Sequence, residues 1–218
     1  MAISNKQEIT CPCGYAFEAE LLSAISVSEN PELKEALLAG EINLVECPHC
    51  GEMFYAENFI LYHDRANELI AFVYPLSFQN HAARCNETMQ KDFKTAVAAF
   101  GEDEKINYEP LLIFGIEDLV LMLKNEQDIE DEEMILTHTA KKLGLETVSI
   151  AASLARKIGL PKVFPVLKNK KEFSAESIIP ALKIFVESND NLTNYAALYQ
   201  KFLKNASVLG AFPAKKSK

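Results

Sequence analysis

The sequence predicts an α+β protein, with a small β-rich domain over residues 1–76 and a mainly α-helical region over residues 77–218. Two observations support this division. The first part holds two close pairs of cysteines among short runs in which apolar and polar residues alternate, as they do in half-buried strands. The second part has apolar residues three and four positions apart, between residue types that begin and end helices.

The β-rich domain begins with two alternating runs, Ile9–Cys11 and Tyr15–Glu20, which predict a hairpin around the first cysteine pair. A short inserted helix is expected next. Asn30 is a good N-cap, Pro31 suits the first helical turn, and Gly40 can end the helix in a left-handed conformation.

Strands are expected to resume after this helix. Ile42–Glu46 leads into the second cysteine pair, and the runs Met53–His63 and Leu69–Tyr74 are rich in aromatic and β-branched residues. The residues from Asp64 to Asn67 are typical of a turn, so these two runs predict a second hairpin.

The region after residue 77 is expected to hold one short strand, Leu111–Phe114, and several helices. The acidic run Asp128–Glu133 suits the start of a helix and Lys141–Gly144 suits its end, because these charges complement the helix dipole. A further helix is expected to end at Arg156–Gly159, and the last helix is expected from Leu192 to Asn205.

The formal net charge of -9 is unevenly distributed along the 218 residues. Residues 1–154 include 10 Lys and Arg against 27 Asp and Glu, whereas residues 155–218 include 12 against 4. Nucleic-acid phosphates bind Lys and Arg, so the acidic part disfavours nucleic-acid binding and the basic end leaves it open. The simpler interpretation is that the two parts attract each other or that their charges are only solvated.

The sequence shows no sign of a membrane anchor or an export signal. Its longest apolar stretches, such as Pro110–Ile116, are far shorter than the roughly 20 residues that span a bilayer. The segment Met1–Thr10 is polar, unlike a secretory signal peptide. We therefore expect a cytoplasmic protein without a membrane partner.

Four of the five cysteines form the strongest candidate site: Cys11 and Cys13 as one pair, Cys47 and Cys50 as the other. In the cytoplasm structural disulfides are rare, and paired cysteines are typical of metal or redox sites. Zinc takes four ligands in a tetrahedron, so two pairs from distant segments can complete one closed site. We therefore predict one zinc ion bound by these four thiolates in a zinc-ribbon-like domain.

The two pairs differ in spacing. In the second pair, Pro48 and Gly51 favour a tight turn that directs both thiolates at one point. In the first pair only Pro12 stands between the cysteines. Residues two apart on an extended segment share a face, so Cys11 and Cys13 could still bind one ion, but the turn around them cannot have the same geometry as the turn of the second pair. The second pair could instead be a redox motif, but a β-like run follows it rather than a helix.

These motifs also carry a resemblance to a known family. In order along the chain they are Cys-Pro-Cys-Gly from Cys11, Asn-Pro-Glu-Leu from Asn30, Gly-Glu-Ile-Asn from Gly40, Cys-Pro-His-Cys-Gly from Cys47 and Leu-Tyr-His-Asp from Leu61. From Glu8 to Pro75, and more weakly to Glu133, the chain resembles the CpXC domain family of bacteria and archaea, named for its Cys-Pro-x-Cys motifs. The resemblance implies zinc binding at both pairs, although the first motif here lacks the usual residue between proline and the second cysteine.

Two other sets of residues could carry chemistry. His63 and Asp64 could serve acid–base catalysis or support a zinc ligand, but neighbours on a strand point to opposite faces, and a turn role for Asp64 is simpler. His81 and Cys85 are four positions apart and could share one face of a helix. A metal would need further ligands there, so a buried thiol near a surface histidine is the simpler interpretation.

The function predicted from these observations is a zinc-stabilised binding or adaptor module that acts on an unidentified protein partner. Four thiolates leave no coordination position for a substrate or a water molecule, which disfavours catalysis by the zinc ion. Two alternatives stay open. One is a nucleic-acid-binding regulator that uses the basic residues 155–218, and the other is an enzyme with a site near His63 and Asp64.

Overall fold

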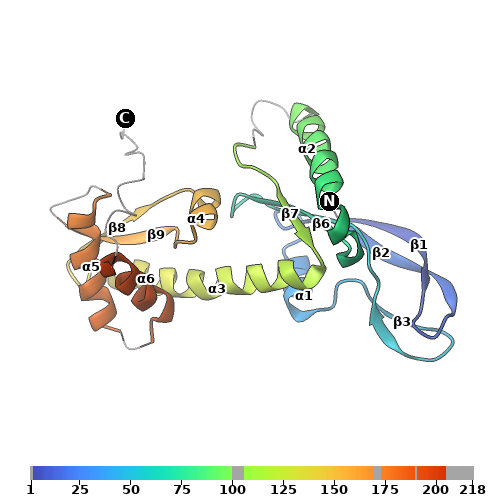
Figure 1. Cartoon of the computed structure of the whole chain (residues 1–218). Helices are drawn as coiled ribbons and strands as arrows, with labels where there is room; N and C mark the ends of the chain where they lie inside the picture. Colours follow the sequence, from blue (N-terminus) through green and yellow to red (C-terminus); the bar gives the residue numbers. More distant parts are fainter. Residues whose placement is uncertain (1, 100–105, 169–172, 190, 205–218) are drawn as a thin grey trace. The chain divides into compact units, whose positions relative to one another are not determined.

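The computed structural model describes residues 2–99, 106–168, 173–189 and 191–204 (Figure 1). Helices and strands are both present in the described residues, which confirms the predicted α+β class. The chain divides into two compact units, Met1–Lys124 and Asn125–Lys218, and each has a hydrophobic core of its own. They are called unit 1 and unit 2 below.

Unit 1 is built on a five-stranded sheet with the order β1-β2-β5-β6-β7. Its strands are β1 (Ile3–Thr10), β2 (Ala16–Ser26), β5 (Ile60–Asp64), β6 (Leu69–Tyr74) and β7 (Leu111–Phe114). The pairs β1–β2 and β5–β6 are antiparallel, as the two expected hairpins require, whereas β2–β5 and β6–β7 are parallel.

Helices cover both faces of this sheet. The side chains of a strand alternate between the two faces, so an apolar strand has side chains to bury on each of them. Leu69, Ala71 and Val73 of β6 share a core with α1 (Glu32–Ala39) and the first part of α3 (Ile116–Thr139). The intervening Ile70 and Phe72 of β6 belong to a second cluster with Met89 of α2 (Ala82–Ala99), which follows the short helix η1 (Leu76–His81) (Figure 1). This burial on both faces explains why the run that forms β6 is continuously apolar.

The inserted helix α1 ends as predicted but begins differently. Gly40 adopts a left-handed conformation, and its backbone N–H bonds back to the carbonyls of the last turn. At the other end, the Asn30 side chain does not cap the helix. Its amide donates to the Glu32 carboxylate at 2.9 Å, while the Asn30 carbonyl accepts the N–H of Leu33 at 3.2 Å.

The expected strand from Met53 to His63 is divided between two sheets. Its first part, β4 (Met53–Tyr55), pairs with β3 (Leu44–Glu46) in a separate two-stranded ribbon, and its last part is β5 of the main sheet. The chain leaves the ribbon at Ala56, whose N–H donates to the carbonyl of Asn43 at 2.9 Å. Pairing partners, not local composition, decide where each strand ends here.

The division after residue 76 that the sequence predicts does not coincide with the division between the two units. Strand β7 lies beyond residue 76 and extends the main sheet by parallel pairing with β6. Leu119 and Leu123 of α3 are buried in the core of the same unit. Residues 77–124 therefore fold together with the β-rich part.

Unit 2 contains the second part of α3, one pair of strands and three further helices among its described residues. These are β8 (Leu145–Ser149), α4 (Ala152–Ile158), β9 (Val163–Leu167), α5 (Ala175–Glu187) and α6 (Thr193–Lys204). The strands pair antiparallel, and Phe164, Phe185 and Tyr195 are fully buried in the core. In the parts of the chain that the structure describes, no helix combines the length and apolar character needed to cross a membrane.

Two adjacent carboxylates of α3 are buried in unit 2. Glu132 accepts the backbone N–H groups of Asn194 at 2.8 Å and Tyr195 at 2.9 Å, at the start of α6. Glu133 accepts the backbone N–H groups of Lys162 and Val163, at the start of β9. Buried carboxylates require hydrogen-bond donors of this kind. Through these bonds α3 fixes the starts of α6 and β9, which lie far from it in the sequence.

Candidate metal centre

The first cysteine pair lies in the turn between β1 and β2. The N–H of Cys11 donates to the carbonyl of Tyr15 at 2.9 Å, and the N–H of Gly14 donates back to the carbonyl of Cys11 at 2.8 Å. Gly14 has a φ of +89°, a conformation that favours glycine. These hydrogen bonds close a turn around Cys11 and Cys13, so the pair lies in the turn of the predicted hairpin and not on an extended segment.

The second pair lies in the turn between β3 and β4, which has the same pattern of hydrogen bonds. The N–H of Cys47 donates to the carbonyl of Glu52 at 2.9 Å, and the N–H of Gly51 donates to the carbonyl of Cys47 at 2.9 Å. This turn is one residue longer than the first, so it returns from the first cysteine to the glycine over four residues instead of three. The first turn thus has the same hydrogen-bond pattern as the second turn but is tighter, which accommodates the shorter spacing of Cys11 and Cys13.

The two turns bring all four thiols together. The four Sγ atoms lie within 4.8 Å of one another, with Cys11 and Cys50 at 3.7 Å and Cys13 and Cys47 at 3.9 Å. A zinc–thiolate bond of about 2.3 Å gives tetrahedral edges of about 3.8 Å, so the donor set and its spacing fit a tetrahedral ion. All four cysteines are free rather than disulfide-bonded. Among the described residues, this is the one group of three or more metal-ligating side chains close enough to share an ion.

Burial differs within each pair. The first cysteine of each turn is buried, with Cys11 2 % and Cys47 1 % exposed, whereas Cys13 and Cys50 are exposed. Burial raises the pKa of Cys11 to about 12. Burial also opposes ionisation of Cys47, but hydrogen bonds from the backbone N–H groups of Cys50 and His49 and from neighbouring thiols outweigh it and lower the pKa of Cys47 to about 7. One thiolate therefore forms near neutral pH, and a bound cation would favour the ionisation of Cys11 that burial opposes.

Aromatic side chains connect the two turns. The rings of Tyr15 and His49 are stacked, with centroids 5.2 Å apart and planes at 16°. Below them, Phe17 meets Phe54 edge to face at 6.3 Å. These contacts were not predicted from the sequence. The sequence carries a signal for them in Tyr15 and Phe17, which alternate after the first pair, and in Phe54, which follows the second.

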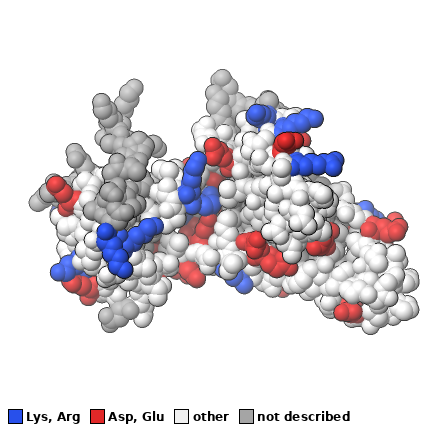
Figure 2. All heavy atoms as spheres, viewed as in Figure 1, with Lys and Arg blue, Asp and Glu red and all other residues white. Residues whose placement is uncertain are grey.

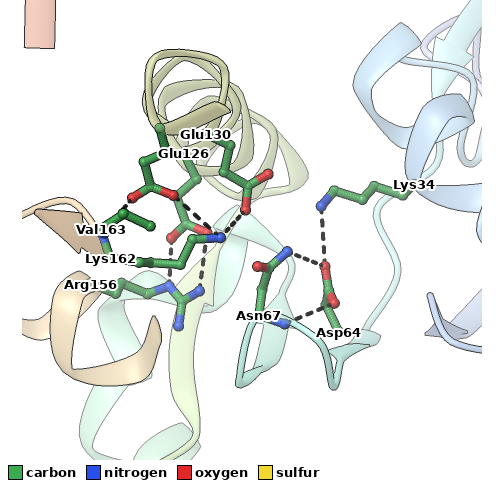
Figure 3. Close-up of polar contacts among 9 residues, drawn as sticks. Lys34, Asp64, Asn67, Glu126, Glu130, Arg156, Lys162 and Val163 are labelled. Atoms are coloured by element: carbon green, nitrogen blue, oxygen red, sulfur yellow. Dashed lines mark hydrogen bonds and ion pairs between the residues drawn. The ribbon is translucent and has the colours of Figure 1, made fainter. Parts of the chain in front are cut away.

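His63 and Asp64 do not form a dyad. The Asp64 carboxylate accepts from the backbone N–H and the amide of Asn67 at 3.2 and 3.1 Å and from Lys34 at 3.1 Å (Figure 3). Burial alone would raise the pKa of Asp64, but Asn67 and Lys34 outweigh it and the pKa is lowered. His63 instead pairs through Nε2 with the hydroxyl of Tyr108 at 2.9 Å, and burial lowers its pKa. The turn role expected for Asp64 is confirmed.

The remaining candidates, His81 and Cys85, match the simpler interpretation of a buried thiol near a surface histidine. Cys85 is buried with 4 % exposure and His81 is exposed. Among the described residues they belong to no group of three metal ligands.

In the basic end, Arg156 bonds to Glu126 at 3.1 Å through Nη2, and Lys162 bonds to Glu130 at 2.7 Å (Figure 3). Both cations are therefore neutralised within unit 2. On the face of unit 2 drawn in Figure 2, basic side chains are interspersed with acidic ones. Lys170, Lys171, Lys215, Lys216 and Lys218 lie outside the described residues.

Comparisons with known proteins give one relationship. Searches of curated proteins and of solved structures gave no match. A family model described as CpXC protein matches residues 9–143, which include both cysteine turns, α3 and the main sheet except for most of β1.

Proposed function

This chain belongs to the CpXC family, and from its four convergent thiols we propose that it binds one zinc ion as the structural centre of a binding or adaptor module. The observation that carries the proposal is the set of Sγ separations, 3.7 and 3.9 Å for the two pairs across the turns, which match the edges of a zinc–thiolate tetrahedron. Zinc fits because its structural sites in proteins commonly use four cysteines.

A structural role suits the place of the site in the fold. The ribbon of β3 and β4 has three residues in each strand, and such a small element buries too little apolar surface to be stable alone. An ion shared between the two turns would fix this ribbon to the β1–β2 hairpin. Structural zinc contributes on the order of 10 kcal/mol of apparent folding free energy in small zinc modules.

Four thiolates would leave no open position on the ion, so we propose no catalytic residues and a role in binding another protein. The free thiols suit a reducing compartment, and we propose that the protein works in the cytoplasm. The nucleic-acid alternative has less support, because Arg156 and Lys162 are already paired with carboxylates. The enzyme alternative has less support because Asp64 is committed to its turn.

Metal analysis with two matched variants tests the zinc proposal. We expect about one zinc per chain in the wild type and in Cys85→Ser, since Cys85 is a buried thiol outside the cluster. Cys47→Ser should lose the metal and unfold at a markedly lower temperature. If Cys47→Ser retains both zinc content and thermal stability, the proposal is wrong.

Replacement of zinc by cobalt(II) tests the geometry separately. A tetrahedral tetrathiolate site would give the intense visible absorption of tetrahedral cobalt and a sulfur-to-metal charge-transfer band. The spectrum should be unchanged in Cys85→Ser and altered in Cys13→Ser, which replaces one exposed thiol of the cluster. An octahedral cobalt spectrum would contradict the four-thiolate site.

A further inference from the structure

Strand β1 forms one edge of the main sheet, and among the described residues no strand pairs with its outer side. It is eight residues long, and each of its side chains is exposed or half-exposed. An edge strand presents backbone N–H and C=O groups that can pair with another chain. This edge therefore offers a surface for addition of a further strand.

The register of the hairpin identifies the residues whose backbone groups point outward. The N–H of Cys11 bonds to the carbonyl of Tyr15, so this opposite pair is hydrogen-bonded. Hydrogen-bonded and non-hydrogen-bonded pairs alternate along an antiparallel ladder. The backbone groups that face away from β2 therefore belong to every second residue of β1, namely Ser4, Lys6, Glu8 and Thr10.

Within one chain, Glu8 on this edge faces a like charge that no ion pair among the described residues offsets. Glu8 lies directly opposite Glu18 of β2, and like charges in that position are unfavourable. Lys6 lies opposite Glu20, whose carboxylate also accepts the Ser4 hydroxyl. Among the described residues Glu8 has no ion pair, so a cation on the outer side of β1 would relieve the repulsion between Glu8 and Glu18.

We propose that β1 pairs antiparallel with β1 of a second copy of this chain, about a two-fold axis at Gln7. In this register Lys6 of each copy lies opposite Glu8 of the other, and Ser4 lies opposite Thr10. All four are residues whose backbone groups point outward, so the pairing satisfies both their N–H and C=O groups. The cation that Glu8 lacks is then supplied by the second copy.

Charge selects this register over its neighbours. A shift of two residues, which keeps the outward groups paired, places Lys6 opposite Lys6 in one direction and Glu8 opposite Glu8 in the other. The order Lys6-Gln7-Glu8 is self-complementary only when the two-fold axis lies at Gln7. The formal charge of -9 on each chain opposes association, but at about 0.15 M salt charges more than about 8 Å apart are largely screened, whereas neighbouring pairs are not.

Sedimentation of the full chain with charge-reversed variants tests the proposal. The wild type should show a concentration-dependent dimer. Lys6→Glu places Glu opposite Glu in the dimer, and Glu8→Lys places Lys opposite Lys, so each should weaken dimerisation by at least about tenfold. An equimolar mixture of the two variants should form a heterodimer, because every opposed pair then has unlike charges.

Two controls separate association from folding. Within one chain Lys6→Glu adds a repulsion with Glu20, whereas Glu8→Lys removes the repulsion with Glu18, so their effects on stability should be opposite while both impair dimerisation. Glu87→Lys changes the net charge as Glu8→Lys does, but Glu87 is an exposed residue of α2, outside the β1 edge, so this variant should leave the dimer intact. A monomeric wild type at 0.2 mM protein, a dimer insensitive to both single variants, or failure of the mixture to associate would each overturn the proposal.

Discussion

The side chain of Asn43 makes two hydrogen bonds to the backbone of Leu22. Its Oδ1 accepts the Leu22 N–H at 2.8 Å, and its Nδ2 donates to the Leu22 carbonyl at 3.0 Å. Leu22 belongs to β2, while Asn43 directly precedes β3 of the cysteine-bearing ribbon. Asn43 is nearly buried and has a φ of +56°, a left-handed conformation that asparagine tolerates better than most residues. One side chain thus connects the ribbon to the main sheet.

Substitutions at Asn43 should separate the hydrogen bonds from the backbone conformation. Asn43→Gly keeps the left-handed φ without strain but loses both bonds, at a cost of about 2 kcal/mol. Asn43→Ala loses the same bonds and adds about 1 kcal/mol of left-handed strain. Urea unfolding of the two variants measures this difference, and equal stabilities would contradict the role assigned to the backbone conformation.

Glu132→Gln should destabilise unit 2 through the start of α6. The carboxylate of Glu132 accepts the Thr193 hydroxyl at 3.0 Å in addition to the two backbone N–H groups of α6. The amide would replace one acceptor oxygen by a donor, so we expect a loss of about 2 kcal/mol in unfolding free energy. Asp131→Asn is the control, since it removes a charge from the same turn of α3 at an exposed position. Similar losses in the two variants would argue against a specific cap.

Glu133 should make the stability of the chain depend on pH. Burial raises the pKa of Glu133 above its usual 4.5, against the effect of the Lys162 and Val163 N–H groups. The folded state therefore keeps this proton to higher pH than the unfolded state, and rising pH through that window favours unfolding. Relative to Glu133→Gln, the wild type should lose unfolding free energy as pH rises from about 4.5 towards neutrality. Urea unfolding of both proteins across this range gives the difference, in which effects common to both cancel. If the unfolding free energy of the wild type instead rises with pH relative to that of Glu133→Gln, the raised pKa of Glu133 is contradicted.

Local signals in the sequence were reliable where one residue type decides the conformation. Gly40 ends α1 because a left-handed residue is needed there, and Asp64 closes the β5–β6 turn with its own carboxylate. The cysteine spacing likewise predicted which thiols meet, since the donor set of a tetrahedral site is complete only with both pairs.

Contacts between distant segments could not be predicted from the sequence. Parallel pairing joins β2 to β5 and β6 to β7 through residues far apart in the chain, and no local pattern specifies such partners. The division of the run from Met53 to His63 depends on the same long-range pairing. The exact geometry at Cys11 and Cys13 could not be predicted for a different reason, because a spacing of two residues is compatible with a strand as well as with the turn that Gly14 permits.

The convergence of the two cysteine turns also has a topological consequence. An ion bound by both Cys13 and Cys47, as proposed, would close the intervening chain, including α1, into a loop, much as a disulfide would. The exposed segment at Ser28 and Glu29 lies inside that loop. A protease that cuts there would leave two fragments still joined through the ion, so the cleaved chain would separate only after the metal is removed and the sheet is unfolded.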